Sequence, residues 1–230
     1  MKTTNEIREQ IKPANKVSLR GTIIGMRSST SMTSFVIISD GGAVKGSTVV
    51  NVVFYGNLKE SFKVKDHVDI IAHMQSKIRR VNERNEFHQI VVGDKIKHTN
   101  RMLADYIPFK EFQTSEGGIP DDINKALIYG KVSRVYMPND SYAIITVAVP
   151  SKEKKLNYVD VICYKRQAQM ASFIETGDCV VCAGEIRSAK EKPKADEIFW
   201  QSVICKDIAK INPEDMDLSI YNKENSEEES

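Results

Sequence analysis

One strand-like pattern occurs twice in this chain. Residues 87–96 read FHQIVVGDKI and residues 199–208 read FWQSVICKDI, and four of the ten positions are identical. At the same offset of 112 residues, Asp66 matches Asp178. A sequence that repeats itself in this way must fold into two similar units, and this constraint governs every other inference from the sequence.

The similarity continues upstream at an offset of 109 residues. There Gly21 matches Gly130, and Tyr55 matches Tyr164. The change of offset falls between Tyr55 and Asp66, so the insertion lies between elements and not within one, as a true duplication predicts. Each copy has about 85 residues. We name the copies repeat 1 (residues 16–98) and repeat 2 (residues 125–211).

Each repeat contains five runs rich in β-branched residues, separated by turn-rich segments, which predicts five strands. Between the third and fourth runs, residues 57–65 and 165–177 each predict a short helix. Five strands with one helix between strands three and four is the order of the OB-fold, a small, partly open barrel. The fold class is therefore expected to be all-β, with two five-stranded OB-fold barrels in tandem. The predicted strands cover residues 17–26, 34–39, 47–56, 67–81 and 87–96 in repeat 1, and 125–136, 142–149, 157–164, 179–189 and 198–208 in repeat 2.

Three segments lie outside the repeats. Residues 1–15 form an N-terminal extension, and residues 99–124 form a linker in which two glycines and a proline indicate irregular structure. This linker is expected to let the two barrels reorient. The tail, residues 212–230, is acidic and poor in apolar residues, so we expect it to be disordered.

The charge of the chain is unevenly distributed. The formal net charge is +2, but residues 213–230 contain seven acidic residues and one lysine, so the rest of the chain carries about +8. A basic body with an acidic tail indicates a nucleic-acid partner. No apolar run approaches the ~18 residues that span a bilayer, and the N-terminus has no apolar segment typical of a signal peptide, so we expect a cytoplasmic protein without a membrane partner.

The four cysteines do not predict a metal site. Cys179 and Cys182 have the CxxC spacing, but residues three apart in a strand point to opposite faces, and there is no second CxxC or nearby histidine. We therefore expect small buried hydrophobic residues in a reducing compartment, and neither a metal nor a cofactor.

The third strand of each repeat predicts a binding face. By alternation, one side of this strand is uniformly apolar and should face the core. A tyrosine on the other side can stack on any base, although tyrosines also suit half-exposed strands in general. On the fifth strand, Trp200 matches His88, and either could stack or lie at the rim. The polar and aromatic face carries Asn51 and Tyr55 in repeat 1, and Tyr158, Asp160 and Tyr164 in repeat 2.

Basic residues recur at equivalent loops of the two repeats, chiefly between strands four and five. A loop lysine alone is usually only solvated, but recurrence beside a tyrosine face favours a groove that follows a phosphate backbone. The candidate phosphate-binding residues are Arg27, Lys77, Arg79, Arg80, Arg84, Arg134, Lys154, Lys155, Lys165, Arg166, Arg187 and Lys190.

Residues 159–188, VDVICYKRQAQMASFIETGDCVVCAGEIRS, resemble the core of bacterial-type single-stranded DNA-binding proteins, and repeat 1 carries a weaker copy. The resemblance implies nonspecific binding of single-stranded DNA in replication, recombination or repair, with stacking roles for Tyr55, Tyr158 and Tyr164. The tail of that family ends in an acidic-apolar tip that recruits other proteins, such as replication or recombination proteins; here the apolar end is missing. Family members usually assemble four barrels, so two barrels per chain imply a homodimer or a monomer.

The sequence also bears on two other classes of function. An OB-fold module that binds protein, such as a replisome or conjugation adaptor, would use the tyrosine face for a partner chain. An enzyme is not expected, because the sequence has no nucleophile elbow, no HExxH and no phosphate-cradling GxxxxGK[ST]. Because repeat 2 carries more aromatic residues than repeat 1, we expect the two repeats to differ in affinity for DNA.

Overall fold

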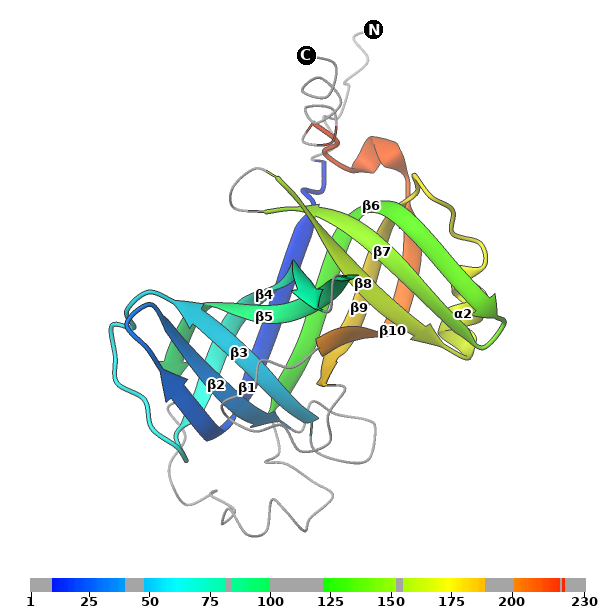
Figure 1. The fold of residues 1–230 in the computed structure, drawn as a ribbon. Helices are drawn as coiled ribbons and strands as arrows, with labels where there is room; N and C mark the ends of the chain where they lie inside the picture. Colours follow the sequence, from blue (N-terminus) through cyan, green and yellow to red (C-terminus); the bar gives the residue numbers. More distant parts are fainter. Residues whose placement is uncertain are drawn as a thin grey trace, which may run out of the picture.

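The computed structural model describes residues 10–39, 48–81, 84–99, 122–151, 155–188, 201–219 and 221, with backbone alone for 78–81 and 84–87. The described chain is all-β apart from two short helices (Figure 1). Its ten strands coincide with the ten predicted runs, and several extend further. Repeat 1 contains β1 (Ala14–Ser28), β2 (Met32–Ser39), β3 (Thr48–Tyr55), β4 (His67–Val81) and β5 (Arg84–His98). Repeat 2 contains β6 (Ile123–Asn139), β7 (Tyr142–Pro150), β8 (Leu156–Tyr164), β9 (Cys179–Ser188) and β10 (Gln201–Ile211).

The strand pairings close on themselves within each repeat. In repeat 1, β1 pairs with both β2 and β4, β2 pairs with β3, and β3 and β4 both pair with β5. Repeat 2 has the same pairings among β6 to β10. Only the contact between the third and fifth strands is parallel, and it is short in both repeats. All ten strands together form one sheet.

Two matched glycines make this closure possible. A Cβ added to Gly21 would lie 2.2 Å from the carbonyl oxygen of Ile38, and one added to Gly130 would lie 2.2 Å from that of Ala148. Each glycine therefore sits where the first strand of its repeat crosses the backbone of the second at close range. Both first strands also carry an irregularity in register just after the glycine, which bends the strand further.

The two repeats are joined by a ladder between β1 and β6, which cross the centre of the molecule (Figure 1). The antiparallel register pairs Ala14 with Tyr129, Val17 with Ala126 and Arg20 with Ile123. Because Val17 and Ala126 are equivalent positions, the ladder is symmetric about this pair, and a pseudo-two-fold axis relates the repeats. The expectation that the linker lets the barrels reorient is therefore wrong, since the ladder holds them together.

A pair of glutamines reinforces this junction across the pseudo-two-fold axis. The side chain of Gln201 accepts from the Asn51 backbone N–H at 2.9 Å and donates to the Asn51 carbonyl at 2.7 Å. The equivalent Gln89 makes the same two contacts with the backbone of Asp160, at 2.9 and 3.4 Å. Each repeat thus contributes one glutamine side chain that bonds to the third strand of the other repeat.

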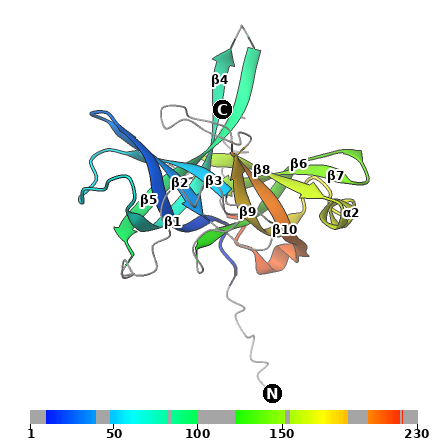
Figure 2. The same cartoon turned by 90° about the horizontal axis from the view of Figure 1, so that it is seen from below.

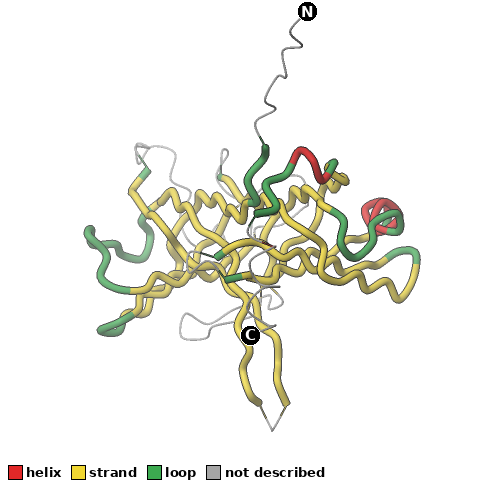
Figure 3. Tube along the Cα trace, turned by 90° about the horizontal axis from the view of Figure 1, so that it is seen from above, coloured by secondary structure: helices red, strands yellow, loops and turns green. Residues whose placement is uncertain are grey.

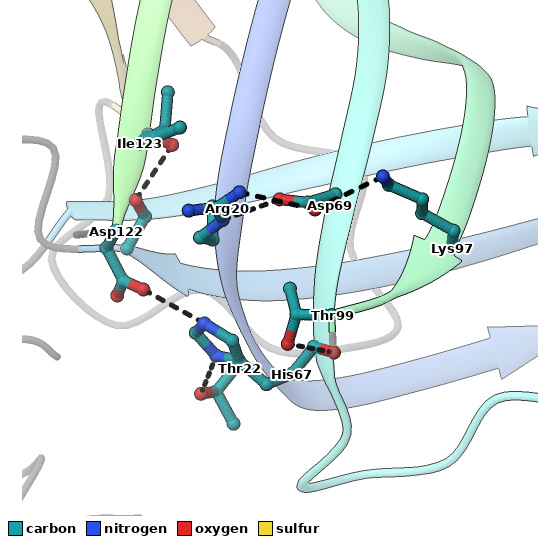
Figure 4. Close-up of polar contacts among 9 residues, drawn as sticks. Arg20, Thr22, His67, Asp69, Lys97, Thr99, Asp122 and Ile123 are labelled. Carbon is teal, nitrogen blue, oxygen red and sulfur yellow. Dashed lines mark hydrogen bonds and ion pairs between the residues drawn. The ribbon is translucent and has the colours of Figure 1, made fainter. Parts of the chain in front are cut away.

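A second group of polar contacts holds the start of β6 against repeat 1 (Figure 4). His67 Nε2 lies 3.3 Å from the buried carboxylate of Asp122, and the other ring nitrogen lies 3.1 Å from the Thr22 hydroxyl. Close by, Ser39 donates to the Ile123 carbonyl at 3.1 Å. These groups are enclosed between strands, so we assign them to the stability of the junction.

The two cores differ in how they fill one equivalent space. In repeat 1 the Phe54 ring lies over Gly93, where a Cβ would come within 2.1 Å of the ring. In repeat 2 the equivalent residues are Cys163 and Cys205, and both are buried. Repeat 1 thus fills this space with one large and one small residue, and repeat 2 fills it with two residues of intermediate size. All four cysteines are free and buried, which confirms the interpretation of them as small hydrophobic residues; burial raises the pKa of the Cys182 thiol.

The predicted helix between strands three and four is confirmed in repeat 2 only. There α2 (Arg166–Ala171) buries Ala168 and Ala171 against the strands. Within residues 56–66, all of which the structure describes, no helix forms, so the prediction for repeat 1 is wrong. The reason is length: this segment is three residues shorter but reaches the same turn. Among the described residues, no helix has the length and apolar character needed to cross a membrane.

The turn after this segment is the same in both repeats. Lys65 (φ 83°) and Gly177 (φ 99°) occupy equivalent left-handed positions. The backbone N–H of Lys65 bonds to the carbonyl of Ile23, and Gly177 bonds to Val132 in the same way. In repeat 1 the ring of Phe62 is buried in this region and packs edge-on against Phe35, which anchors the shorter segment without a helix.

The beginning of the tail is ordered, contrary to the expectation for residues 212–230. The helix η2 (Pro213–Asp215) is followed by Met216, which is buried and bridges to Ile11. The buried Tyr221 donates from its hydroxyl to the carbonyl of Ala148 at 2.8 Å. Met216 thus fixes this stretch beside Ile11, and Tyr221 fixes it against repeat 2. The tail beyond Tyr221 lies outside the described residues.

Candidate nucleic-acid interface

Two exposed tyrosines end the third strands of the repeats. Tyr55 is 51% exposed and Tyr164 is 46% exposed. The residue after each has a positive φ, 80° at Gly56 and 50° at Lys165, so the chain turns away immediately. Each ring is therefore presented at a corner of its repeat, where an unpaired base can reach it.

In repeat 1 a lysine accompanies the tyrosine ring. Lys77 lies on β4, and its ammonium nitrogen donates to the Tyr55 hydroxyl and stands 4.9 Å from the ring centroid. The hydrogen bond holds the ammonium group beside the ring, at its hydroxyl end. The pair places a positive charge next to an exposed aromatic surface, which is the combination that binds a phosphate and its base together.

In repeat 2 other tyrosines surround Tyr164. The Tyr142 ring lies 5.4 Å from the Tyr164 ring, because the two residues are direct cross-strand partners on β7 and β8. Burial, and then the neighbouring Tyr164 and Tyr136, raise the pKa of Tyr142. Tyr136 on β6 is itself 52% exposed. The three rings form an aromatic surface, which we call the tyrosine cluster.

Sequence reasoning missed Tyr136 and Tyr142. A signal was available, since Tyr136 alternates with the half-buried Val135 and Met137, and Tyr142 begins a predicted strand opposite Tyr164. At the matched positions repeat 1 has Arg27 and Thr33, so its surface is poorer in rings. The larger number of rings in repeat 2 favours the prediction that repeat 2 binds DNA more tightly than repeat 1, which stays a prediction.

The face expected to be open on β3 is largely closed. Val50, Val52 and Phe54 face the core as predicted, but Asn51 and Val53 on the opposite side are buried as well. They are covered because the other repeat packs there, with Gln201 bonded to the Asn51 backbone. In repeat 2 the equivalent face is more open, and Tyr158 is 38% exposed.

The candidates on the fourth and fifth strands are only partly described. His88 is half-buried on β5 opposite Lys77. Arg79, Arg80 and Arg84 belong to the hairpin of β4 and β5, which projects from the body of the molecule (Figure 2, Figure 3). Their side chains lie outside the described part of the structure. Trp200, Lys154 and Lys190 also lie outside the described residues.

The remaining candidate cations lie at the surface, and one of them, Arg187, is committed to an ion pair. Arg187 pairs with the buried carboxylate of Glu185 at 2.7 Å, and Lys206 approaches the same carboxylate at 3.2 Å. Arg187 therefore balances a buried charge within the protein, as such a carboxylate requires. The structure does not gather the other exposed cations into one cluster. They are Arg27, Arg134, Lys155, Lys165 and Arg166.

Comparison with known proteins identifies the fold. No protein-family model matches the chain, and no curated protein matches its sequence. The wild-type single-stranded DNA-binding protein from Thermus aquaticus aligns with a TM-score of 0.59 at 12% identity, covering 88% of this chain and 95% of that one. A deletion mutant of the same protein gives a TM-score of 0.59, at 12% identity, over 87% and 95%. The chain shares that fold.

A replication protein A heterotrimer bound to single-stranded DNA also aligns, at 8% identity over 100% of this chain and 55% of the other. Its TM-score of 0.27 is too low to indicate a shared fold. Within the described part of the chain, no three His, Cys, Asp or Glu side chains come together as metal ligands.

Proposed function

We propose that this protein binds single-stranded DNA without catalysing a reaction, and that each repeat is an OB-fold barrel. The observation that carries the proposal is the matched placement of Tyr55 and Tyr164, exposed at the same corner of two equivalent repeats. The fold shared with a single-stranded DNA-binding protein supports it. The protein would coat and protect single strands in replication, recombination, repair or plasmid or phage transfer.

The chemistry of the surface predicts little sequence preference. A tyrosine ring stacks on the face of any base, and a lysine binds any phosphate, so neither reads the edges of the bases. Duplex DNA keeps its bases stacked on each other and does not offer them to the rings. The protein would act in the cytoplasm, as a monomer or as a homodimer with four barrels, alongside replication or recombination proteins.

Fluorescence anisotropy with labelled oligo(dT) tests the proposal. We expect tight binding to the single strand, much weaker binding to a duplex of equal length, and a steep fall in affinity with salt. Tyr164→Ala should weaken binding by about 1–3 kcal/mol, the value of one stacked base, while Tyr164→Phe keeps the ring and should bind nearly as the wild type. Tyr55→Ala should cost less than Tyr164→Ala.

A protein-binding module is the second candidate, and one observation favours it. Phe173, just after α2, is 77% exposed, and exposed phenylalanines are typical of protein interfaces. If this were the main function, oligo(dT) and duplex would bind equally weakly and Tyr164→Ala would change neither. That result would reject DNA binding in favour of a protein partner.

A further inference from the structure

A hollow of about 730 Å³ lies at the junction of the two repeats. We call it the junction hollow. One wall comes from β1, β3, β4 and β5 of repeat 1, and the other comes from the end of β7 and the start of β8 in repeat 2, so neither repeat forms it alone. The residues that matter here are Tyr55, Ser76 and Lys77 from repeat 1, and Ser151, Lys155 and Asn157 from repeat 2.

The walls of the junction hollow are held together by one buried side chain. The carbonyl oxygen of the Asn157 side chain accepts from the backbone N–H of Ser76 at 2.9 Å and from its hydroxyl at 2.7 Å. The amide nitrogen of the same side chain donates to the Met74 carbonyl at 2.9 Å. The relative position of the two walls is therefore set within the protein chain before any ligand binds.

The lining of the junction hollow suits a nucleic-acid strand. Lys77 and Lys155 stand on opposite walls, while Asp94, the acidic residue among the described lining residues, is already paired with His73 at 2.9 Å. Tyr55 supplies an exposed ring at one side. Two cations from different repeats and one aromatic ring in a polar hollow match a phosphodiester backbone with an unstacked base.

The path continues into repeat 2. Leu156 lines the junction hollow, and Tyr158 lies two residues further along β8, on the same side of the strand. The backbone N–H of Tyr158 also donates to the hydroxyl of Ser76, a lining residue, at 3.4 Å, so the strand at Tyr158 adjoins the hollow. The partly exposed rings of Tyr55 and Tyr158 thus flank the hollow from the two repeats.

We propose that the junction hollow binds the nucleotides of a single strand that passes from repeat 1 to repeat 2. Lys77 and Lys155 hold successive phosphates, and bases on either side stack on Tyr55 and Tyr158. This inference rests on the proposed function and deepens it, because it makes the two repeats one continuous binding site in place of two independent ones. A strand long enough to touch both repeats gains contacts that no short strand can make.

The test compares oligo(dT) lengths with a double variant, Lys77→Ala with Lys155→Ala. Both lysines are exposed, so the fold should persist, which thermal unfolding checks. For an oligonucleotide long enough to span both repeats, loss of two phosphate contacts should reduce the slope of log K against log salt by about 1.4 and the affinity at low salt by tenfold or more. An oligonucleotide of about 4–6 nucleotides, held by a single repeat, meets at most one of the two lysines, so its affinity should fall less than that of the long strand.

The control is Lys63→Ala with Lys131→Ala, which removes two exposed lysines that do not line the junction hollow. If the control lowers the slope for long strands as much as the test variant does, the effect is one of net charge and the inference is overturned. Equal losses with short and long strands would also overturn it. If wild-type protein binds no single strand of any length, the proposed function itself has failed, which is a distinguishable result.

Discussion

Replacing Gln201 by alanine should destabilise the junction between the repeats more than an alanine substitution of an exposed residue would. Gln201 is 1% exposed, and its side chain satisfies both the N–H and the C=O of Asn51. Asn51 is buried too, so water cannot take the place of the lost amide. The substitution therefore leaves two buried backbone groups without these partners.

The magnitude follows from those two groups. A buried polar group left unsatisfied costs about 1–3 kcal/mol, so for two such groups we expect the free energy of unfolding to fall by about 2–6 kcal/mol. The equivalent Gln89→Ala should cost less, about 1–2 kcal/mol. Its contact with the Asp160 carbonyl is longer, 3.4 Å, and Asp160 is only half-buried, so water can reach the exposed groups.

Urea denaturation of the wild type and the two alanine variants measures both values. Gln201→Glu serves as a further variant, because its carboxylate can accept from the Asn51 N–H but cannot donate to the carbonyl. It should be destabilised at least as much as the alanine variant, since it also buries a charge. Equal losses in Gln201→Ala and Gln89→Ala, or a loss below about 1 kcal/mol for Gln201→Ala, would refute the reasoning from unsatisfied backbone groups.

Three further predictions concern the packing of the repeats. Gly130→Ala should lower the free energy of unfolding by about 3 kcal/mol or prevent folding, because the new methyl group meets the carbonyl oxygen of Ala148 at 2.2 Å; circular dichroism during thermal unfolding reports it. Phe54→Cys and Gly93→Cys should each destabilise repeat 1, but the double variant reproduces the pair of cysteines found in repeat 2. In urea unfolding, the double variant should therefore lose less free energy of unfolding than the two single variants together; additive losses would contradict the view that the two pairs fill the same space. Tyr221→Phe should cost about 1 kcal/mol at neutral pH. Burial raises the pKa of Tyr221 from 10.0 to about 12, so its stabilising contribution is complete below pH 10.0 and is lost as the pH rises toward 12; the variant should lack this alkaline decline and one late step in the tyrosine absorbance titration.

The strands could be predicted from the sequence because their signals are local. Alternation and turn residues mark each run, and the duplication gives every assignment a second test. The glutamine shared by FHQIVVGDKI and FWQSVICKDI could be seen as an identity between the repeats. Its partner could not, because Gln201 bonds to Asn51, which lies 150 residues away in the chain. Nothing in a local pattern indicates which distant backbone a glutamine will meet.

Other features were wrong or missed for physical reasons. The helix in repeat 1 was predicted from its likeness to repeat 2, but a segment three residues shorter has too little chain for it. The ordered start of the tail depends on Met216 and Tyr221, whose burial outweighs an acidic composition. Tyr142 was missed because the predicted binding face was confined to the third strand, whereas Tyr142 lies on the neighbouring β7 as the cross-strand partner of Tyr164.

The pseudo-two-fold junction also bears on how such a molecule can evolve. In a symmetric homodimer every substitution appears twice, so an advantageous ring on one face must be tolerated on the other. Here the two halves are encoded separately, and they have drifted apart: His73 and Asp94 in repeat 1 stand where repeat 2 has Glu185 and Lys206, with acid and base exchanged. Fusion of the halves thus frees one surface to specialise while the glutamines that join them stay the same.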